Sequence, residues 1–247
     1  MIVTWQQLGR FGNNMFQYAL AHIVAEKYKC KVKTDTNFSE GETHFSGFYD
    51  EFFYLDEKHN IGIENFSYVY DDTIKNFLLT NDTYIKNIRL EGYFQDNELY
   101  KRKNLKKYFK VNENKIKKYH NDDICLSLRL GSDYESLGWV IPSNIFVNVL
   151  RNISYRKLFI VTDYYNESYL KEFKEFHPEV ICNNSSTPID DFYNLMSFKN
   201  LIIGNSTFSY WAAVLGNSNK IYTTKNWDWC NLSYILGKKS KTFFYER

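Results

Sequence analysis

The sequence predicts an α/β protein in which two Rossmann-like domains face each other across a ligand cleft. Two observations lead to this prediction. The chain opens with a strand, a glycine-containing loop, an amphipathic helix and a second strand. Its second half alternates short apolar runs with helical patterns, which is typical of a parallel sheet with helical crossovers. We place the N-terminal domain at residues 1–122 and the C-terminal, ligand-binding domain at residues 123–247.

Composition is that of a folded chain with ample material for a core. The 247 residues include 21 Tyr and 20 Phe but only 3 Pro and 11 Gly, which argues against low-complexity linkers. A net charge of +2 is too small to indicate nucleic-acid binding. With no apolar run of about 18 residues and no signal peptide, a cytoplasmic protein is expected. A reducing compartment also suits the widely spaced cysteines, which are Cys30, Cys125, Cys182 and Cys230.

The first domain is predicted to begin with a strand at residues 2–5, a helix ending near Lys29 and a strand at residues 31–35. Apolar residues three and four positions apart predict the helix. Ligands of doubly wound α/β domains bind at the carboxyl ends of the strands. The loop at residues 9–14, which follows the first strand, is therefore expected to face a ligand.

Within this loop, Gly9 and Gly12 would let the backbone approach a ligand closely. Two glycines alone are weak support, because the Gly-x-Gly-x-x-Gly fingerprint is absent. If the loop does not bind a ligand, Arg10 is expected to be a solvated charge of the loop and Asn13 to be the N-cap of the helix.

The middle of the chain is less regular. Residues 38–77 show no clear period and are expected to form loops and short helices, whereas residues 88–94 alternate like a strand. Lys101–Lys118 carries lysines throughout and is read as two amphipathic helical turns with a solvated face. The alternative is attraction of this segment to an anionic membrane surface or an anionic glycan.

The second half is predicted to contain five strands. A helix is expected between each pair of consecutive strands: one begins near residue 145, one ends near residue 176, one spans residues 190–198 and one begins near residue 207. A closing helix is expected at residues 232–236. The strands are predicted at residues 124–130, 157–163, 180–181, 201–203 and 220–223.

The turn after the fourth of these strands is rich in groups that bind anions. Gly204 ends the strand, and Asn205, Ser206 and Thr207 are helix-capping residue types. Free N–H groups at the helix start favour an anion, and the hydroxyls can add donors. The alternative is that these hydroxyls only cap the helix.

Polar residues also follow the other strands. Arg129 near the end of one strand needs an anionic partner, which is either a carboxylate of the protein or a phosphate. Asp163 ends the next strand, and Ser206 follows a third. Their convergence at one edge of the sheet predicts a nucleotide-type ligand.

Three motifs resemble those of a known family, the bacterial α1,2-fucosyltransferases. Gly9–Ala21 is similar to the N-terminal motif, Glu91–Gln95 to a mid-chain motif, and Leu201–Leu215 to the C-terminal motif of that family. The resemblance covers nearly the whole chain.

This resemblance implies a GT-B fold and inverting transfer of fucose from GDP-β-L-fucose to a sugar hydroxyl of an oligosaccharide or polysaccharide. It implies neither a metal nor another cofactor, and the nearest approach to an Asp-x-Asp metal motif is Asp133-Tyr134-Glu135. The oligomeric state is not predicted.

The resemblance also implies roles for single residues. Arg129 would stabilise charge on the β-phosphate, Asn13 would close over the donor, and Asp163 would accept hydrogen bonds from the guanine edge. Asp133 would orient Arg129 or act as the base for the acceptor hydroxyl. The full set of expected donor contacts is Arg10, Phe11, Gly12, Asn13, Ser127, Arg129, Asp163, Asn205, Ser206, Thr207, Phe208 and Ser209.

One segment departs from the family pattern His-x-Arg-Arg-Gly-Asp. Ser127 stands for the histidine, Leu130 stands for the second arginine, and one extra residue precedes Asp133. This departure leaves two alternatives open, which are a different nucleotide-sugar donor and a glycan- or nucleotide-binding protein with weakened catalysis.

Overall fold

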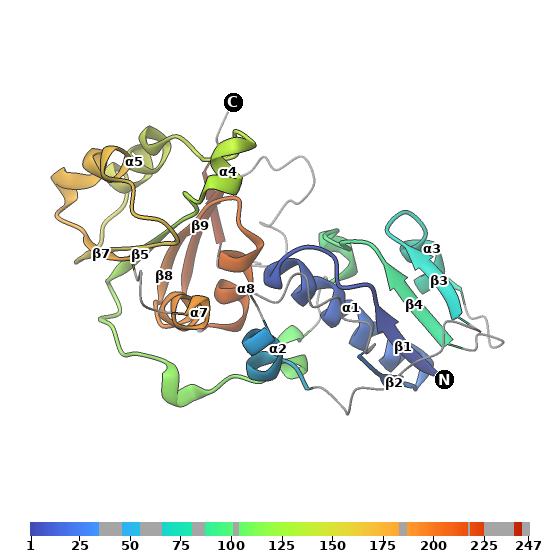
Figure 1. The fold of residues 1–247 in the computed structure, drawn as a ribbon. Coiled ribbons are helices and arrows are strands. Elements are labelled where there is room, and N and C mark those ends of the chain that lie inside the picture. Colours follow the sequence, from blue (N-terminus) through green and yellow to red (C-terminus); the bar gives the residue numbers. More distant parts are fainter. Residues whose placement is uncertain are drawn as a thin grey trace. The chain divides into compact units, whose positions relative to one another are not determined.

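A computed structural model describes residues 1–34, 46–54, 66–80, 87–100, 104–182, 187–216, 218–224 and 240–243. The chain divides into two compact units, a first unit at Met1–Val111 and a second unit at Asn112–Arg247. Both are shown in Figure 1. Each unit is described by itself.

Residues just after Val111 bond to the second unit, although the sequence-based division assigned them to the first domain. The N–H of Asn112 donates to the Tyr193 hydroxyl at 3.0 Å. The Tyr119 ring stacks on Phe198 with centroids 3.9 Å apart. These contacts explain why the second unit begins at Asn112; the functional division at residues 122 and 123 stays a prediction.

The first unit contains a four-stranded parallel sheet in the order β2-β1-β4-β3. Because β4 and β2 lie on opposite sides of β1, the strand order reverses between β1 and β4. The carboxyl ends of these two strands therefore form the switch point at which α/β sheets bind ligands. The strands are β1 (Ile2–Trp5), β2 (Lys31–Val32), β3 (Phe66–Tyr70) and β4 (Asn87–Glu91).

Helix α1 (Phe11–Tyr28) carries much of the first unit's core. Its apolar side chains are almost fully buried, and the helix ends at Lys29, which adopts the left-handed conformation. Aromatic rings fill the space beside it, and Tyr18 stacks on Phe53 with centroids 4.1 Å apart. The other helices and 3-10 turns among the described residues of this unit are α2 (Ser46–Phe52), α3 (Ile74–Leu79), η2 (Asn97–Leu99) and η3 (Leu105–Tyr108).

The second unit contains a six-stranded parallel sheet in the order β10-β9-β8-β5-β6-β7. Counted from β5, this is the Rossmann order 3-2-1-4-5-6 read from the opposite edge, with its reversal between β5 and β8. The strands are β5 (Ile124–Leu128), β6 (Leu158–Thr162), β7 (Glu179–Ile181), β8 (Asn200–Ile203), β9 (Lys220–Thr224) and β10 (Ser240–Phe243).

Helices lie on both faces of this sheet, with α5 on one side and α7 and α8 on the other (Figure 1). Crossover helices on both faces are what a doubly wound sheet requires, because both faces of its strands are apolar. The helices and 3-10 turns are η4 (Glu113–Lys115), α4 (Ser132–Ser136), α5 (Ser143–Arg151), α6 (Glu167–Leu170), η5 (Lys171–Phe176), α7 (Pro188–Met196) and α8 (Thr207–Leu215).

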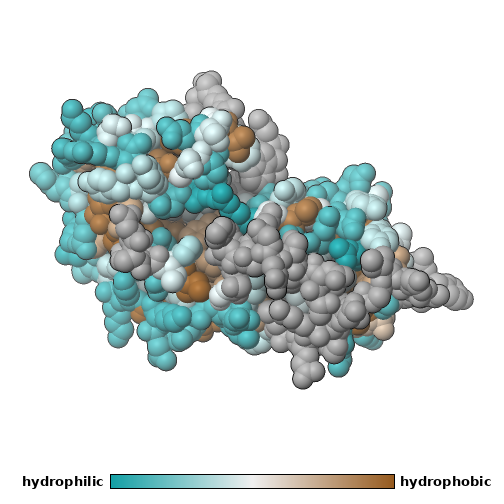
Figure 2. Space-filling model, viewed as in Figure 1, coloured by the Kyte–Doolittle hydropathy of each residue, from teal (hydrophilic) through white to brown (hydrophobic). Residues whose placement is uncertain are grey.

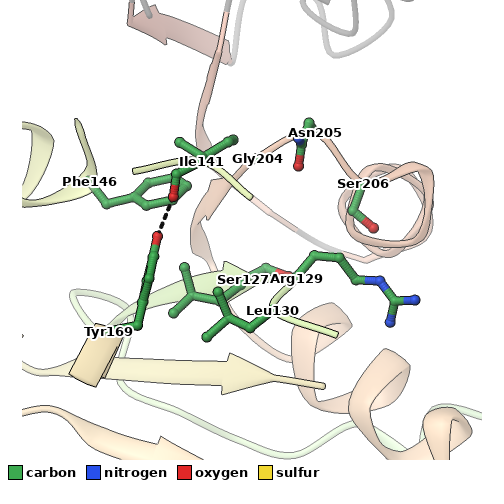
Figure 3. Close-up of a pocket in the computed structure, with 10 residues that line it drawn as sticks. Ser127, Arg129, Leu130, Ile141, Phe146, Tyr169, Gly204, Asn205 and Ser206 are labelled. Atoms are coloured by element: carbon green, nitrogen blue, oxygen red, sulfur yellow. Dashed lines mark hydrogen bonds between the residues drawn. The ribbon is translucent and has the colours of Figure 1, made fainter. Parts of the chain in front are cut away.

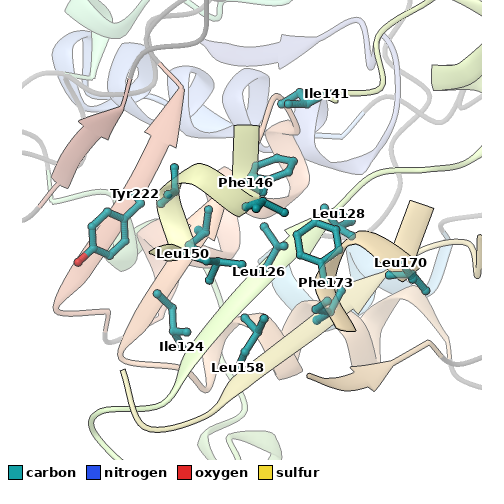
Figure 4. Packing of buried hydrophobic residues seen from close by; sticks show 14 of the residues in the cluster. Ile124, Leu126, Leu128, Ile141, Phe146, Leu150, Leu158, Leu170, Phe173 and Tyr222 are labelled. Atoms are coloured by element: carbon teal, nitrogen blue, oxygen red, sulfur yellow. The ribbon is translucent and has the colours of Figure 1, made fainter. Parts of the chain in front are cut away.

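One hydrophobic cluster of the second unit lies between the sheet and α5 (Figure 4). Leu126 and Leu128 of β5 face Phe146 and Leu150 of this helix in one buried cluster. Leu126 is fully buried, so its truncation to Ala would cost about 2–5 kcal/mol. This packing fixes where β5 ends, and with it the position of Arg129.

The structure confirms α/β architecture with parallel sheets. Elements that the sequence analysis did not separate are β3, within the irregular region at residues 38–77, and β10. The lysine-rich segment forms short 3-10 turns, η3 and η4, where helical turns were predicted. The predicted closing helix at residues 232–236 lies outside the described residues.

Hydrophilic side chains cover most of the coloured surface of the second unit in Figure 2, with small apolar spots between them. Within the described part of the chain, no helix combines the length and apolar character needed to cross a membrane.

Candidate functional site

The switch point of the second unit carries a small hollow (Figure 3). Its residues come from the carboxyl end of β5, from the turn between β8 and α8, from the segment before α5, and from α5 and α6. They are Ser127, Leu128, Arg129, Leu130, Ile141, Phe146, Tyr169, Gly204, Asn205 and Ser206. Of the residues predicted for the donor, the structure thus brings Ser127, Arg129, Asn205 and Ser206 to one place.

Arg129 lies between two carboxylates. Its Nη1 donates to Oδ2 of Asp163 at 2.5 Å, and its Nη2 donates to Oδ1 and Oδ2 of Asp133 at 3.2 and 3.0 Å. The guanidinium also lies 5.2 Å from the ring centre of Tyr134. The first of the two predicted alternatives, an arginine paired with carboxylates of the protein, is what the structure shows.

Asp163 does more than pair with Arg129. Its Oδ1 accepts the backbone N–H of Leu130 at 2.7 Å, and its Oδ2 accepts that of Gly131 at 3.1 Å. The carboxylate at the end of β6 therefore holds the turn that follows β5. The predicted contact of Asp163 with a guanine edge would add to these bonds or replace them, because its oxygens already accept donors of the chain.

The formal charge of this cluster is negative. One guanidinium and two carboxylates sum to −1, and the side chains of Arg129, Asp133 and Asp163 are 25%, 33% and 23% exposed. At such partial burial, charges interact more strongly than in bulk water. Arg129 in this arrangement is neutralised rather than available as a bare cation.

The start of α8 supplies a second anion-binding group. Ser206 is the N-cap residue, yet its side chain makes no hydrogen bond to the first turn of the helix. The aligned peptide dipoles of the helix place partial positive charge at this start, which favours an anion. Figure 3 shows the Arg129 side chain extending away from Leu130 and Phe146, on the side where Ser206 lies.

Tyr134 ties the turn after β8 to α4, and the sequence analysis did not identify it. Its hydroxyl donates to the backbone oxygen of Asn205 at 3.1 Å, and the Asn205 amide donates to the backbone oxygen of Trp139 at 2.6 Å. Burial, which outweighs the nearby Arg129 charge, raises the pKa of Tyr134 to about 12. Its phenol therefore stays protonated and cannot serve as a base near neutral pH.

Ser127 and Ser209 contact each other. Their hydroxyl oxygens are 2.6 Å apart and both residues are buried, so this pair joins β5 to α8. Both were predicted to contact the donor, and in the structure each hydroxyl is already used by the other. Of the remaining predicted residues of α8, Phe208 packs edge-on against Phe192, whereas Thr207 is half-buried.

Two glycines allow close packing around the hollow. A Cβ on Gly131 would lie 2.7 Å from Oδ2 of Asp163 and 2.9 Å from Oδ1 of Asp133. One on Gly204 would lie 2.8 Å from Cδ1 of Ile141. Side chains at either position would displace residues that form the site, because real Cβ contacts are not this short.

The switch point of the first unit carries two amide side chains. The Gln95 amide donates to Oδ1 of Asn13 at 2.8 Å, which joins the loop after β4 to the first turn of α1. Gly9 has φ +69°, and a Cβ there would lie 2.3 Å from Nδ2 of Asn13. The loop thus needs glycine at this position, both for conformation and for space.

Two further residues of the N-terminal motif hold this loop. Nδ2 of Asn14 donates to the backbone oxygens of Gly9 and Arg10, and the Gln17 amide exchanges two hydrogen bonds with the backbone of Leu8. The sequence analysis did not predict that Asn14 and Gln17 hold this loop, because helical periodicity does not show which backbone groups a polar side chain bonds to.

The helix begins earlier than predicted, which changes how the other residues of the loop are placed. Arg10 is the N-cap and is exposed, and Gly12 lies inside the first turn. The alternative of Asn13 as N-cap is wrong, because α1 starts at Phe11. Phe11 is 1% exposed and stacks on Phe48. Its ring belongs to the core, and its predicted contact with the donor stays a prediction.

The family of the chain can be stated from its sequence profile. The profile described as Glycosyl transferase family 11 matches residues 2–239, almost the entire chain. The chain belongs to glycosyl transferase family 11. This member of the family is therefore a glycosyltransferase.

Solved structures support the fold of this family 11 chain. The α-1,6-fucosyltransferase NodZ of Bradyrhizobium, soaked with GDP-fucose, matches with a TM-score of 0.56 at 15% identity, over 87% of this chain and 92% of that one. A point mutant of FUT1 of Arabidopsis thaliana in complex with GDP matches with 0.52 at 11% identity, over 93% and 71%. POFUT1 in complex with GDP-fucose matches with 0.51 at 10% identity, over 99% and 97%.

At these identities the likeness shows a common fold. No protein with a curated function matches this family 11 chain in a sequence search.

The structure also bears on the lysine-rich segment and on possible metal ligands. Lysines of the segment Lys101–Lys118 are partly engaged, since Lys107 pairs with Glu26 and Lys115 lies 5.3 Å from the ring centre of Tyr193; residues 101–103 lie outside the described residues. No group of three or more His, Cys, Asp or Glu side chains with the geometry of a metal site occurs in the described ranges.

Proposed function

We propose that this chain transfers L-fucose from GDP-β-L-fucose to a sugar hydroxyl of an oligosaccharide or polysaccharide, with inversion and in α1,2 linkage. Its place in glycosyl transferase family 11 supports glycosyl transfer. The single observation that carries the donor site is Arg129 at the β5–β8 switch point, in the same hollow as Ser206, the N-cap residue of α8. A cation beside a helix start is suited to a diphosphate.

We propose a GT-B arrangement in which the two units face each other across the donor. Two features support it. Each unit has a parallel sheet with its own switch point, and each switch point carries polar groups, Asn13 and Gln95 in one and Arg129 and Ser206 in the other. Nucleotide-binding residues at carboxyl strand ends are the rule for such sheets.

The chemistry needs positive charge where the leaving group forms. As the bond between fucose and the β-phosphate breaks, negative charge builds on the diphosphate. Arg129 and the start of α8 would stabilise this charge, because preorganised donors act most strongly on charge that appears in the transition state. Asp163 would keep the guanidinium in place through its bonds to Nη1 and to the Leu130–Gly131 backbone.

The acceptor side is proposed to use the first unit, with Asn13 closing over the donor. Asp133 is proposed either to orient Arg129 or to act as the base. NodZ is an α-1,6-fucosyltransferase by its description, so linkage does not follow from fold. The α1,2 linkage and the inversion are tested by NMR of the product, through the anomeric coupling and the shifted acceptor carbon. A β-fucoside or a linkage to another hydroxyl would overturn them.

The donor proposal is tested by calorimetric titration with GDP, GDP-fucose, GDP-mannose and UDP-sugars. Wild-type protein is expected to bind GDP and GDP-fucose, and Arg129→Ala to lose about 1.5–3 kcal/mol of this binding. Arg151→Ala is the matched control, because Arg151 pairs with Glu175 on the surface of α5. Equal binding of GDP by wild type and Arg129→Ala would contradict the site.

A second candidate is the same fold with another nucleotide-sugar donor. The observation that favours it is the departure at Ser127 and Leu130, since Ser127 pairs with Ser209 and Leu130 is 5% exposed within the core. The hollow therefore has one arginine where the family pattern has two. Preference for a uridine nucleotide in the titration would select this candidate. Binding of donor without turnover would select a weakened, binding-only protein.

We also propose a cytoplasmic location, with peripheral contact of Lys101–Lys118 at an anionic membrane surface. Binding to anionic vesicles that fades at moderate salt would support that contact. Equal binding to neutral vesicles would contradict it.

A further inference from the structure

The charge around Arg129 opposes the ligand that the site is proposed to bind. This inference rests on the proposed function, in which a nucleoside diphosphate binds at Arg129. Asp133 and Asp163 already overcompensate the guanidinium, because two carboxylates face one cation. A diphosphate would bring at least two further negative charges. Like charges a few ångströms apart in a partly buried site repel strongly.

The two carboxylates are held in different ways. Asp163 accepts Nη1 of Arg129 and also the backbone N–H groups of Leu130 and Gly131. Its place is therefore set by the turn after β5 as well as by the arginine. Moving Asp163 would leave two backbone donors without their acceptor, which is costly in a partly buried turn.

Asp133 contacts the arginine in a different way. It lies on α4, a helix of five residues, and its side chain is 33% exposed, against 23% for that of Asp163. Its two bonds to Arg129 both come from Nη2, at 3.2 and 3.0 Å. A rotation of the Asp133 side chain into solvent would free Nη2 without breaking a bond between Asp163 and the backbone.

We propose that Asp133 is a displaceable counter-ion of Arg129. Without nucleotide it neutralises the guanidinium. The diphosphate then takes Nη2 from Asp133, while Asp163 stays bonded to Nη1 and keeps the guanidinium in position. After the exchange, one carboxylate and one guanidinium remain in the cluster, and their charges sum to zero. The diphosphate then no longer meets a net negative charge at Arg129. Donor affinity is set by this competition.

Gly131 leaves room for this arrangement of Asp133 and Asp163 around Arg129. It lies between the two carboxylates, and a Cβ there would meet both of them. Its φ of −61° is open to any residue. Glycine is thus required at this position for the space that lets both carboxylates reach Arg129, and not for backbone conformation.

The test compares GDP with guanosine in calorimetric titrations of the full chain. Asp133→Asn is expected to bind GDP roughly fivefold more tightly than wild type, because it removes a competing charge worth about that much for a partly exposed pair. Guanosine binding is expected to stay unchanged, since guanosine carries no phosphate. Asp163→Asn is expected to weaken GDP binding roughly tenfold, because it loosens the turn and the guanidinium together.

Glu135→Gln is the matched control. Glu135 lies on the same helix and is exposed, so this change removes an equal charge that has no contact with Arg129. GDP affinity within about twofold of wild type in this variant, beside tighter binding in Asp133→Asn, would support the counter-ion. Asp133→Ser serves as a second variant, with the same expected direction, in case Asp133→Asn unfolds.

The outcomes separate this inference from the proposed function. If wild type binds GDP and Asp133→Asn binds it equally or more weakly, Asp133 is not a competitor and only this inference is overturned. A gain of similar size in Glu135→Gln would also overturn it, because general charge would then explain the effect. If neither wild type nor any variant binds GDP, the proposed donor site fails, and this inference fails with it.

Discussion

Nη1 of Arg129 lies 2.5 Å from Oδ2 of Asp163, although the two residues are 34 positions apart in the chain. They come together because β5 and β6 are neighbouring parallel strands, paired from Ile124 with Leu158 to Leu128 with Thr162. Each residue follows the end of its strand, and the register brings the two ends level. The site thus depends on a pairing between strands, and on a carboxylate that serves both the arginine and the turn beside it.

Replacing Arg129 by lysine tests whether geometry or charge matters. Lysine keeps the charge but lacks the planar fork in which Nη1 stays bonded to Asp163 while Nη2 faces a phosphate. We expect kcat of Arg129→Lys to fall about 100-fold or more, because stabilisation of the leaving group is lost in the transition state. Steady-state transfer kinetics measure this. A lysine variant with wild-type kcat would show that a point charge is enough.

The pair of Ser127 and Ser209 is expected to be structural. Either single change to alanine leaves a buried hydroxyl without its partner, which should cost about 1–3 kcal/mol of unfolding free energy. The double variant should cost less than the sum, with a coupling of about 1 kcal/mol. Urea unfolding of the four proteins measures this cycle. Additive losses would mean that the 2.6 Å contact contributes nothing.

Restoring the histidine of the family pattern is expected to harm this chain. Ser127→His would place a ring where the Ser209 hydroxyl is 2.6 Å away and only 7% of the residue is exposed. Overpacking of this kind costs about 1–3 kcal/mol. Thermal unfolding measures the loss, and Ser209→Gly in the same chain should recover part of it. An unchanged melting temperature would show that the helix start yields easily.

Two glycines close together in sequence should respond in opposite ways to alanine. Gly131→Ala meets the carboxylates of Asp133 and Asp163 but suffers no backbone strain, so it should disturb GDP binding more than stability. Gly138→Ala finds open space but has φ +64°, so it should cost about 1–2 kcal/mol of stability and leave GDP binding unchanged. Paired titration and unfolding measurements separate the two effects; the reverse pattern would contradict this reading of the turn.

His22 in the first unit should make stability depend on pH. Burial lowers its pKa from 6.5 to about 4, opposed by the Glu26 carboxylate and assisted by Lys107; the rings of Tyr18 and Tyr108 pack against it. Its Nε2 has no hydrogen-bond partner among the described residues. The unfolded chain therefore binds more protons than the folded chain between pH 6.5 and about 4.

Stability should consequently fall as pH drops through this window, by up to about 1.4 kcal/mol for each pH unit. The contribution of neutral His22 to stability should be fully present above pH 6.5. Urea unfolding at several pH values measures the slope, and His22→Phe should flatten it. His120→Gln is the control, because its side chain is 55% exposed. An equal slope in wild type and His22→Phe would contradict the assignment.

Sequence patterns located the elements that carry the site with little error. The apolar run at Leu201–Ile203 and the capping types after it lie in β8 and at the start of α8. Arg129 and Asp163, predicted within the last residues of their strands, lie directly after β5 and β6. Period and capping are local properties, so a short stretch of chain suffices to read them. The three motifs at Gly9–Ala21, Glu91–Gln95 and Leu201–Leu215 likewise indicated the family whose profile matches residues 2–239.

The partners of these residues were decided only by the tertiary structure. Nothing near Ser127 in sequence indicates Ser209, and nothing near Arg129 indicates that Asp163 also holds the backbone of Leu130 and Gly131. From the sequence alone, the partner of Arg129 could be either a carboxylate of the protein or a phosphate, because either anion would balance the charge of the guanidinium. Strand register and the crossover over the sheet decide which side chains meet, and these are properties of the whole fold. The sequence by itself therefore determined which residues stand at the strand ends, whereas the folded sheet decided what each one touches.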